Sequence, residues 1–198
     1  MKKQGIGHPR QGSLFKTHWR HRYSHGGVLR QQRAGRGQRP LVTREPIHLV
    51  FKLQRQRLRQ KSLRCGRSFA LCQAIIAKYA VRFFVGVEQL SVQGDHIHIL
   101  LRARRRGAIQ NFLRVVAGQI AQQFSKQGLL VAPLVTDGQK VRLWRYRPFT
   151  RVVRGWRAFQ IVRDYIQLNE REARSEIPYR KERLRGMSSV DWELLWGP

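Results

Sequence analysis

Apolar residues change their spacing at Gly107, and this change limits the fold more than any other feature of the sequence. Before it, residues 96–103 alternate with the two-residue period of a strand. After it, apolar residues recur at the spacing of an amphipathic helix over residues 108–126, at Ile109, Phe112, Leu113, Val116, Ile120 and Phe124. The chain therefore combines strands with helices that each bury one face.

Segments rich in apolar and β-branched residues predict three more strands, at residues 47–53, 81–92 and 141–153. Helical spacing predicts two more helices, at residues 64–80 and 157–173. The elements therefore follow one another as β-α-β-β-α-β-α. This order predicts an α+β, ferredoxin-like fold: a four-stranded antiparallel sheet with helices on one face.

Individual residues add detail to this arrangement. Gly94-Asp95 predicts a tight antiparallel hairpin between the second and third strands. Pro148 interrupts the fourth strand, so we expect that strand to leave the sheet near the proline. Cys65 and Cys72 are seven residues apart, which places them on one helix face as a reduced core pair.

Positive charge is the second strong feature. The chain has 40 Lys and Arg against 11 Asp and Glu, a formal net charge of +29. Self-repulsion on this scale destabilises a compact chain, so we expect a polyanionic partner, and nucleic acid above all. We expect no membrane association, because the sequence has neither a run of about 18 apolar residues nor a hydrophobic signal core.

The charge is uneven along the chain. Residues 1–45 carry eleven Lys and Arg and a single acid, with little apolar periodicity, so we expect a flexible basic arm there. Its four histidines, His8, His18, His21 and His25, have no partner cysteine or carboxylate, which favours solvated side chains over a metal site. A folded domain follows at residues 46–176, and residues 177–198 form a C-terminal extension.

His96 and His98 are two residues apart, so on a strand both imidazoles point to the same face. Ile97, Ile99 and Leu101 then point to the other face, into the helix-covered core. Neutral imidazoles bind divalent ions, and two of them leave positions open for a third ligand, water and substrate. A metal-binding pair and a pair of surface histidines both fit this pattern.

A later helix carries Tyr165 and, one turn on, Asn169. A tyrosine can attack a phosphodiester and hold the product covalently. Its pKa of about 10 means that it needs help, which a divalent ion on the scissile phosphate supplies. Asn169 can offer an oxygen to the same ion. Alternatively, Tyr165 lies on the rim of an amphipathic helix beside Ile161, Val162 and Ile166.

Taken together, four segments resemble the single-tyrosine HUH transposases, which include small insertion-sequence transposases and REP-associated tyrosine transposases. They are residues 92–101 with the histidine pair, the helix from Gly107, residues 143–149 (Leu-Trp-Arg-Tyr-Arg-Pro-Phe) and residues 165–169 (Tyr-Ile-Gln-Leu-Asn). Family members often have Pro-Asn where this chain has Gly94-Asp95, and Pro where it has Glu170.

The resemblance implies that residues 46–176 form a catalytic domain acting on single-stranded or hairpin DNA with Mg²⁺ or Mn²⁺. His96, His98 and Asn169 would hold the ion. Tyr165 would leave a 5′-phosphotyrosine bond and a free 3′-OH. A bacterial, cytoplasmic, nucleoid-associated protein is implied, as a homodimer or a monomer. The predicted DNA contacts are Arg102, Arg104, Arg105, Arg106, Arg145 and Arg147.

Two other functions stay open. A non-catalytic, basic nucleic-acid-binding protein could use a ferredoxin-like sheet much as RNA-recognition domains do, and aromatic residues exposed on the sheet would favour it. A ribosome-associated basic protein fits the charge alone. The arginines after the histidine pair could likewise be a solvated strand end instead of a path for a phosphate backbone.

Overall fold

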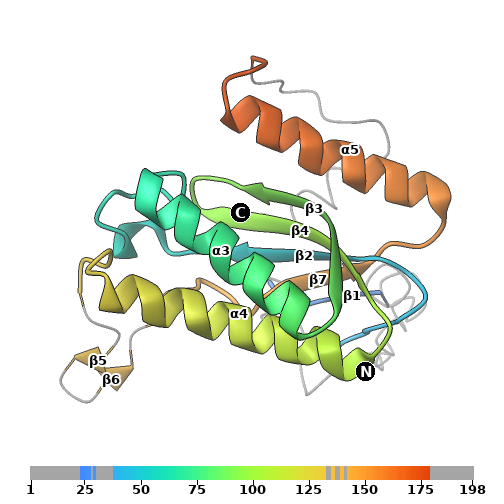
Figure 1. The fold of residues 1–198 in the computed structure, drawn as a ribbon, viewed down its shortest axis with the longest axis horizontal. Helices are drawn as coiled ribbons and strands as arrows, with labels where there is room; N and C mark the ends of the chain where they lie inside the picture. Colours follow the sequence, from blue (N-terminus) through green and yellow to red (C-terminus); the bar gives the residue numbers. More distant parts are fainter. Residues whose placement is uncertain are drawn as a thin grey trace, which may run out of the picture.

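The computed structural model describes residues 23–27, 29, 38–132, 135–136, 139–140 and 142–178. In chain order its elements are β1 (Ser24–His25), β2 (Ile47–Lys52), the 3₁₀ turn η1 (Arg55–Arg57), α3 (Gly66–Arg82), β3 (Val85–Val92), β4 (His96–Ala103), α4 (Arg106–Lys126), β5 (Val135–Thr136), β6 (Gln139–Lys140), β7 (Phe149–Val152) and α5 (Trp156–Ala173). Figure 1 shows a central sheet with α3 and α4 on one side and α5 on the other. The predicted α+β class is confirmed.

The main sheet has five strands in the order β1-β7-β2-β4-β3, and all its pairs are antiparallel. The β3–β4 pair is the predicted hairpin, closed by a 2.8 Å hydrogen bond from the Gln93 backbone N–H to the His96 carbonyl. The sheet has one strand more than the four expected, because Ser24–His25, from the predicted arm, pairs with β7. That two-residue strand is too short to give an apolar period.

The principal core lies between the sheet and the two helices α3 and α4. Ile97, Ile99 and Leu101 of β4 all point into it and are completely buried. The whole apolar face predicted for α4 is buried there as well, at Ile109, Phe112, Leu113, Val116, Ile120 and Phe124. The residues that strand alternation and helical spacing predict to be buried thus pack in one core.

Helix α5 covers the opposite face of the sheet, so the expectation that all helices lie on one face is wrong. Its Phe159, Val162 and Ile166 pack with Leu100 of β4 in a second, smaller cluster. The cause is visible in β4: the face that carries the histidines also carries Leu100, and an apolar residue there requires cover. An amphipathic helix provides it.

The strand predicted at residues 141–153 is too long. Only β7 (Phe149–Val152) pairs in the sheet, and the preceding segment touches β2 through one isolated bridge between Leu53 and Trp144. The Trp144 indole N–H donates to the Ala117 carbonyl at 3.0 Å, so this segment is tied to α4. Pro148 therefore precedes the strand and does not end it.

Two boundaries near α3 also differ from prediction. The helix continues through Val81 and Arg82, and the strand expected from residue 81 begins only at Val85. Between them Phe84 has a left-handed φ of +53°. Cys65 is the N-cap of α3 and not part of it, so it does not share a helix face with the buried Cys72. Both cysteines are free thiols, as predicted.

Most of the predicted arm and extension lies outside the described residues, including His8, His18 and His21. The described part of the arm is docked: Leu29 is 2 % exposed. The Arg39 guanidinium donates to the Pro148 carbonyl at 2.7 Å. Across the described residues, no helix combines the length and the apolar character needed to span a bilayer.

Candidate active site

Three histidines from two neighbouring strands gather beneath α5. His96 and His98 of β4 share the face that carries Leu100, as the alternation predicted. His48 of β2 lies on the same face, and its Nε2 is 3.0 Å from Nδ1 of His98. The three side chains are almost wholly enclosed, with 7 % of His96, 0 % of His98 and 1 % of His48 exposed. They are therefore not surface histidines.

Each imidazole of the predicted pair is held through its Nδ1 atom. The His96 Nδ1–H donates to the Asp95 carboxylate at 2.6 Å. His98 uses Nδ1 for the contact with His48. Partners of this kind fix the orientation and the tautomer of a metal-ligating histidine. Coordination of an ion by either ring would accordingly use Nε2.

Burial lowers the pKa of all three imidazoles. It is the largest cause for His48, whose pKa falls to about 3, with Arg151 and His96 contributing. Burial also lowers the pKa of His98 well below its usual value, and the neighbouring histidines add to this. For His96, burial lowers the pKa by more than Asp95 raises it. The rings are therefore neutral at neutral pH, which metal binding requires.

Tyr165 of α5 lies directly against this group. Its ring centroid is 5.4 Å from that of His98, with the two planes nearly perpendicular at 83°. The side chain is completely buried and packs in the same apolar cluster as Val162 and Ile166, so a structural role on the amphipathic helix and a role as nucleophile both fit its position. The predicted nucleophile and the histidine pair thus come together within one chain.

Asn169 follows one turn after Tyr165 and is 6 % exposed. Its Nδ2 atom makes no hydrogen bond to any described residue. A buried N–H donor left in this state suits an acceptor such as a phosphate oxygen, and Oδ1 of the same amide is the atom that could bind an ion. The donor set of two imidazoles and one amide suits an open divalent-ion site, completed by water or phosphate oxygens. Among the described residues, no three or more His, Cys, Asp or Glu side chains are arranged to hold a metal ion, so an ion bound by His96 and His98 would need Asn169, water or phosphate oxygens as its other ligands.

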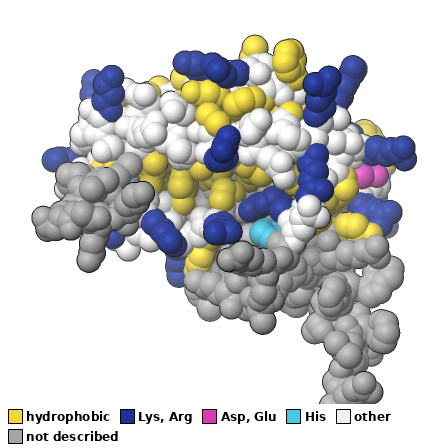
Figure 2. Space-filling model, turned by 90° about the horizontal axis from the view of Figure 1, so that it is seen from below, with side chains coloured by type: hydrophobic (Ala, Val, Ile, Leu, Met, Phe, Trp, Pro, Cys, Tyr) yellow, Lys and Arg dark blue, Asp and Glu magenta, His cyan; other side chains and the backbone are white. Residues whose placement is uncertain are grey.

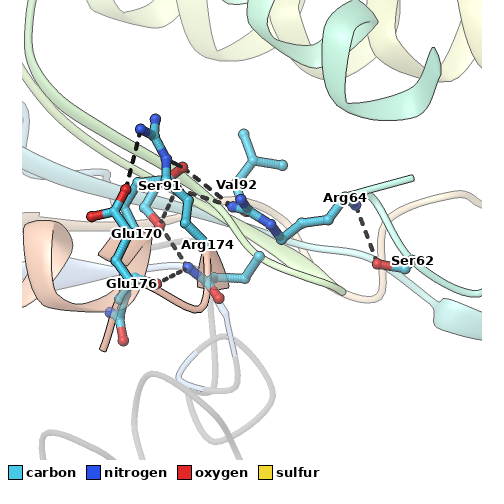
Figure 3. Close-up of polar contacts among 9 residues, drawn as sticks. Ser62, Arg64, Ser91, Val92, Glu170, Arg174 and Glu176 are labelled. Carbon is cyan, nitrogen blue, oxygen red and sulfur yellow. Dashed lines mark hydrogen bonds and ion pairs between the residues drawn. The ribbon is translucent and has the colours of Figure 1, made fainter. Parts of the chain in front are cut away.

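The end of α5 beyond Asn169 is tied to the sheet by a polar cluster, shown in Figure 3. Glu170 accepts hydrogen bonds from the Ser91 hydroxyl at 3.0 Å and from the Arg64 guanidinium at 3.2 Å. The Gln93 side-chain amide donates to the Asn169 carbonyl at 2.8 Å. Glu170 thus anchors the helix that carries Tyr165 and Asn169 to the sheet.

The six predicted DNA contacts are divided between the two ends of β4. Arg102 lies within β4, and Arg104, Arg105 and Arg106 follow the strand, all at the end away from His96. Arg145 lies at the other end, where it lines a cavity of about 360 Å³ together with Lys52, Arg55 and Asp95.

These arginines belong to a basic surface. Arg104, Arg105, Arg145 and Arg147 are exposed. Lys and Arg side chains are spread over the face shown in Figure 2, whereas acidic side chains are sparse there. Such a surface attracts a polyanion along its length.

Residues 42–169 match the sequence profile of the family described as "Transposase IS200 like". The chain belongs to this family. The match contains every residue of the site described above, from His48 to Asn169. No curated protein matches the transposase chain in sequence.

Two solved structures resemble this IS200-like transposase. The structure of the REP-associated tyrosine transposase bound to a REP hairpin aligns with a TM-score of 0.53 at 14 % identity, covering 74 % of this chain and 81 % of that one. A protein of Deinococcus radiodurans R1 assigned as a transposase aligns with a TM-score of 0.42 at 19 % identity, covering 70 % and 98 %. At this level of identity the first structure supports the shared fold.

Proposed function

We propose that this IS200-like transposase is a single-tyrosine HUH enzyme that cleaves and rejoins single-stranded or hairpin DNA with Mg²⁺ or Mn²⁺. The observation that carries the proposal is the contact between Tyr165 and His98 beneath α5. The REP hairpin bound to the solved relative supports a hairpin as substrate. We also assign the sheet without β1 to the ferredoxin-like class, because its elements keep the β-α-β-β-α-β order.

The proposed reaction is a transesterification at phosphorus. The Tyr165 phenol oxygen attacks the scissile phosphate, its proton passes to water, and the bond between phosphorus and the 3′-oxygen breaks. The 3′-oxygen takes up a proton and leaves as a 3′-OH, while the 5′-phosphate stays on Tyr165. Attack by another 3′-OH releases Tyr165 and joins the strands. The bond energy is conserved, so no further reactant is required.

His96 and His98, through Nε2, and Asn169 are the proposed ligands of the ion. A bound Mg²⁺ or Mn²⁺ would stabilise negative charge on the phosphoryl oxygens. Asp95 and His48 hold the two imidazoles in place. Phosphates next to the reacting one fit the polar cavity lined by Lys52, Arg55 and Arg145, which Asp95 links to the site.

The candidate active site is closed to DNA in this structure. Neither Tyr165 nor His98 has exposed surface, so a DNA phosphate reaches them only after α5 moves relative to the sheet. The apolar contacts that α5 makes with the sheet are few, since the second cluster contains six buried residues. A helix held by so small a core can shift without unfolding the principal core.

The test is covalent capture. Purified protein with Mn²⁺ is incubated with a broad library of labelled single-stranded hairpins, and protein–DNA adducts are resolved on denaturing gels. We expect an adduct that Tyr165→Phe abolishes and that Tyr79→Phe, a matched change on α3, leaves intact. Absence of any adduct across the library would overturn the proposed activity. An adduct that survives Tyr165→Phe would refute the assigned nucleophile.

The non-catalytic alternative, a nucleic-acid-binding sheet, is less well supported. Such a sheet needs an open face with aromatic side chains on its strands. Here α3 and α4 cover one face and α5 the other (Figure 1). Within the described residues, the large hydrophobic side chains that are exposed, Val81, Phe84, Val131 and Trp156, all lie outside the strands.

A further inference from the structure

A second cavity, of about 1040 Å³, lies at the far end of β4 from His96. It opens between the α3–β3 connection, the end of β4 and the first turn of α4. Among the described residues, its lining includes Phe84, Asn111 and four arginines, Arg82, Arg102, Arg104 and Arg105, and no acidic residue. We call it the Phe84 pocket. The cavity combines apolar side chains with arginines. A nucleotide has matching parts, a flat nucleobase and a charged phosphate.

Phe84 is unusual in both exposure and backbone. Its side chain is 88 % exposed, and its φ is +53°. The position follows the last residues of α3, where glycine is the favoured residue because a Cβ there is strained. The preceding Phe83 already supplies the apolar contact with the core, where it stacks on Tyr79 with centroids 5.9 Å apart. Phe84 therefore adds backbone strain without adding core packing, which is typical of a residue with a functional role.

The charged groups around the ring favour an anion. Arg82, Arg104 and Arg105 are exposed on its rim. Arg102 pairs with Glu88 at 3.2 Å and lies over the Phe159 ring of α5 at 5.3 Å. The first turn of α4 also lines the pocket, contains no acidic residue and has no side-chain cap, so its backbone N–H groups add positive potential.

The pocket is within reach of a strand bound at the candidate active site. Arg102 lies on the same face of β4 as His98, four residues further along, a separation of roughly 13 Å at the usual strand rise. A single strand that continues from the cleaved phosphate can cross this distance and then pass around the end of β4 to Phe84 and Asn111, which belong to the side of the sheet that α3 and α4 cover. Base-paired DNA cannot offer a base face to Phe84, whereas an unpaired nucleotide can.

We propose that the Phe84 pocket binds an unpaired nucleotide of the DNA that flanks the hairpin, with the base stacked on Phe84 and its phosphate held by Arg82, Arg104 and Arg105. Asn111, exposed on the wall, faces the base edge as a donor and acceptor. The inference rests on the proposed function, because it takes single-stranded or hairpin DNA as the substrate. It adds a binding site separate from Tyr165 and the histidines.

The test compares two DNA ligands at fixed salt: a hairpin alone, and the same hairpin with a single-stranded flank containing 2-aminopurine. We expect the flanked hairpin to bind the wild-type protein more tightly and its fluorescence to be quenched by stacking. Phe84→Gly should weaken binding of the flanked hairpin by about 5- to 150-fold, the value of one stacked base. Phe84→Trp should keep both tight binding and quenching.

Phe84→Gly also separates this role from a folding defect. Glycine relieves the positive φ, so the variant should unfold at a higher temperature than wild type while binding the flank less well. Val81→Ala, 79 % exposed on the last turn of α3 and outside the pocket, is the control and should bind both ligands as wild type does. Equal binding of both hairpins by wild type and Phe84→Gly would overturn the inference, whether or not Tyr165 forms an adduct. Absence of the adduct, with the flank effect intact, would overturn the catalytic proposal alone.

Discussion

His48 lies on β2, 50 residues before His98 of β4 in the chain, yet its ring contacts that of His98 in the candidate metal site. The contact between their rings occupies Nδ1 of His98, so Nε2 is the atom that would bind the proposed ion. A residue in this position acts through another side chain and is a positioning residue. Loss of such a partner typically lowers metal affinity by about 10- to 100-fold.

We therefore expect His48→Leu to weaken Mn²⁺ binding about 10- to 100-fold, as measured by calorimetric titration of the metal into the protein. His48→Gln, whose side-chain oxygen can still accept a hydrogen bond from His98, should retain much of the affinity. The leucine variant fills a buried position with an apolar side chain, so its melting temperature reports separately on folding. Unchanged Mn²⁺ affinity in His48→Leu would show that the contact has no role in metal binding.

The lowered pKa values of the buried histidines predict a loss of stability in acid. In the unfolded chain these imidazoles take up protons below pH about 6.5, whereas in the folded chain they stay neutral, His48 down to about pH 3. The unfolded state therefore binds more protons, and the free energy of unfolding falls as pH decreases through this window. Each such histidine contributes up to about 1.4 kcal/mol per pH unit where it is protonated in the unfolded chain and neutral in the folded one.

Urea unfolding of the metal-free protein between pH 4 and pH 7 measures this dependence. His48→Leu removes one titrating group and should flatten the slope. A wild-type stability that is constant, or higher at pH 4 than at pH 7, would contradict the buried, neutral state of the three rings.

Of the site residues predicted from the sequence, the structure brings His96, His98 and Tyr165 into contact and places Asn169 one turn after Tyr165 on the same helix. The sequence also contained a signal for His48. In β2, Ile47, Leu49 and Phe51 occupy alternate positions and face the principal core, which leaves His48 on the opposite face. The alternation argument used for the histidine pair applies equally there, but the direct pairing of β2 with β4 is a tertiary fact that no local pattern reveals.

Among the elements, α5 depends most on a few polar contacts, because its apolar cluster with the sheet is small. Glu170 receives hydrogen bonds from Ser91 and Arg64, and only 15 % of its side chain is exposed. Hydrogen bonds to a charged group at a partly buried site are each worth about 1.5–3 kcal/mol. Glu170 thereby sets where Tyr165 and Asn169 lie along the sheet.

We expect Glu170→Gln to loosen α5 by about 1–3 kcal/mol, seen as faster hydrogen exchange of α5 amides with little change in α4. Glu176→Gln is the matched control: its carboxylate pairs with Arg171 and Arg174 at the surface, 46 % exposed, where ion pairs contribute little. Equal exchange in the two variants would mean that the Glu170 cluster does not anchor the helix.

Periodicity predicted the elements that bury one clear face, β4 and α4, to within two residues. It failed where composition is ambiguous. The aromatic residues of segment 143–149 resemble a strand, yet Trp144 packs toward α4 and Pro148 delays pairing until β7. The amphipathic pattern of α5 predicts a helix but not which side of the sheet it covers, because both sides carry apolar residues.

At the scale of the whole molecule, charge should govern DNA affinity. If the six predicted arginines each contact a phosphate, the logarithm of the association constant should fall with the logarithm of salt concentration with a slope of about −4 for single strands. Arg105→Gln should reduce the magnitude of that slope by about 0.7, and Arg114→Gln, exposed on α4 and outside both cavities, should not change it. Fluorescence anisotropy at several salt concentrations gives the slope, and a value near zero would exclude the electrostatic interface.

The two-residue strand β1 has a consequence beyond the fold. It pairs Ser24 with Arg151 and His25 with Thr150, which occupies the open edge of β7. An uncovered edge is a template for pairing with strands of other chains. Proteolysis that removed this segment would therefore expose the edge of β7, and exposed strand edges favour aggregation. The part of the chain that matches the family begins at residue 42 and so does not include β1.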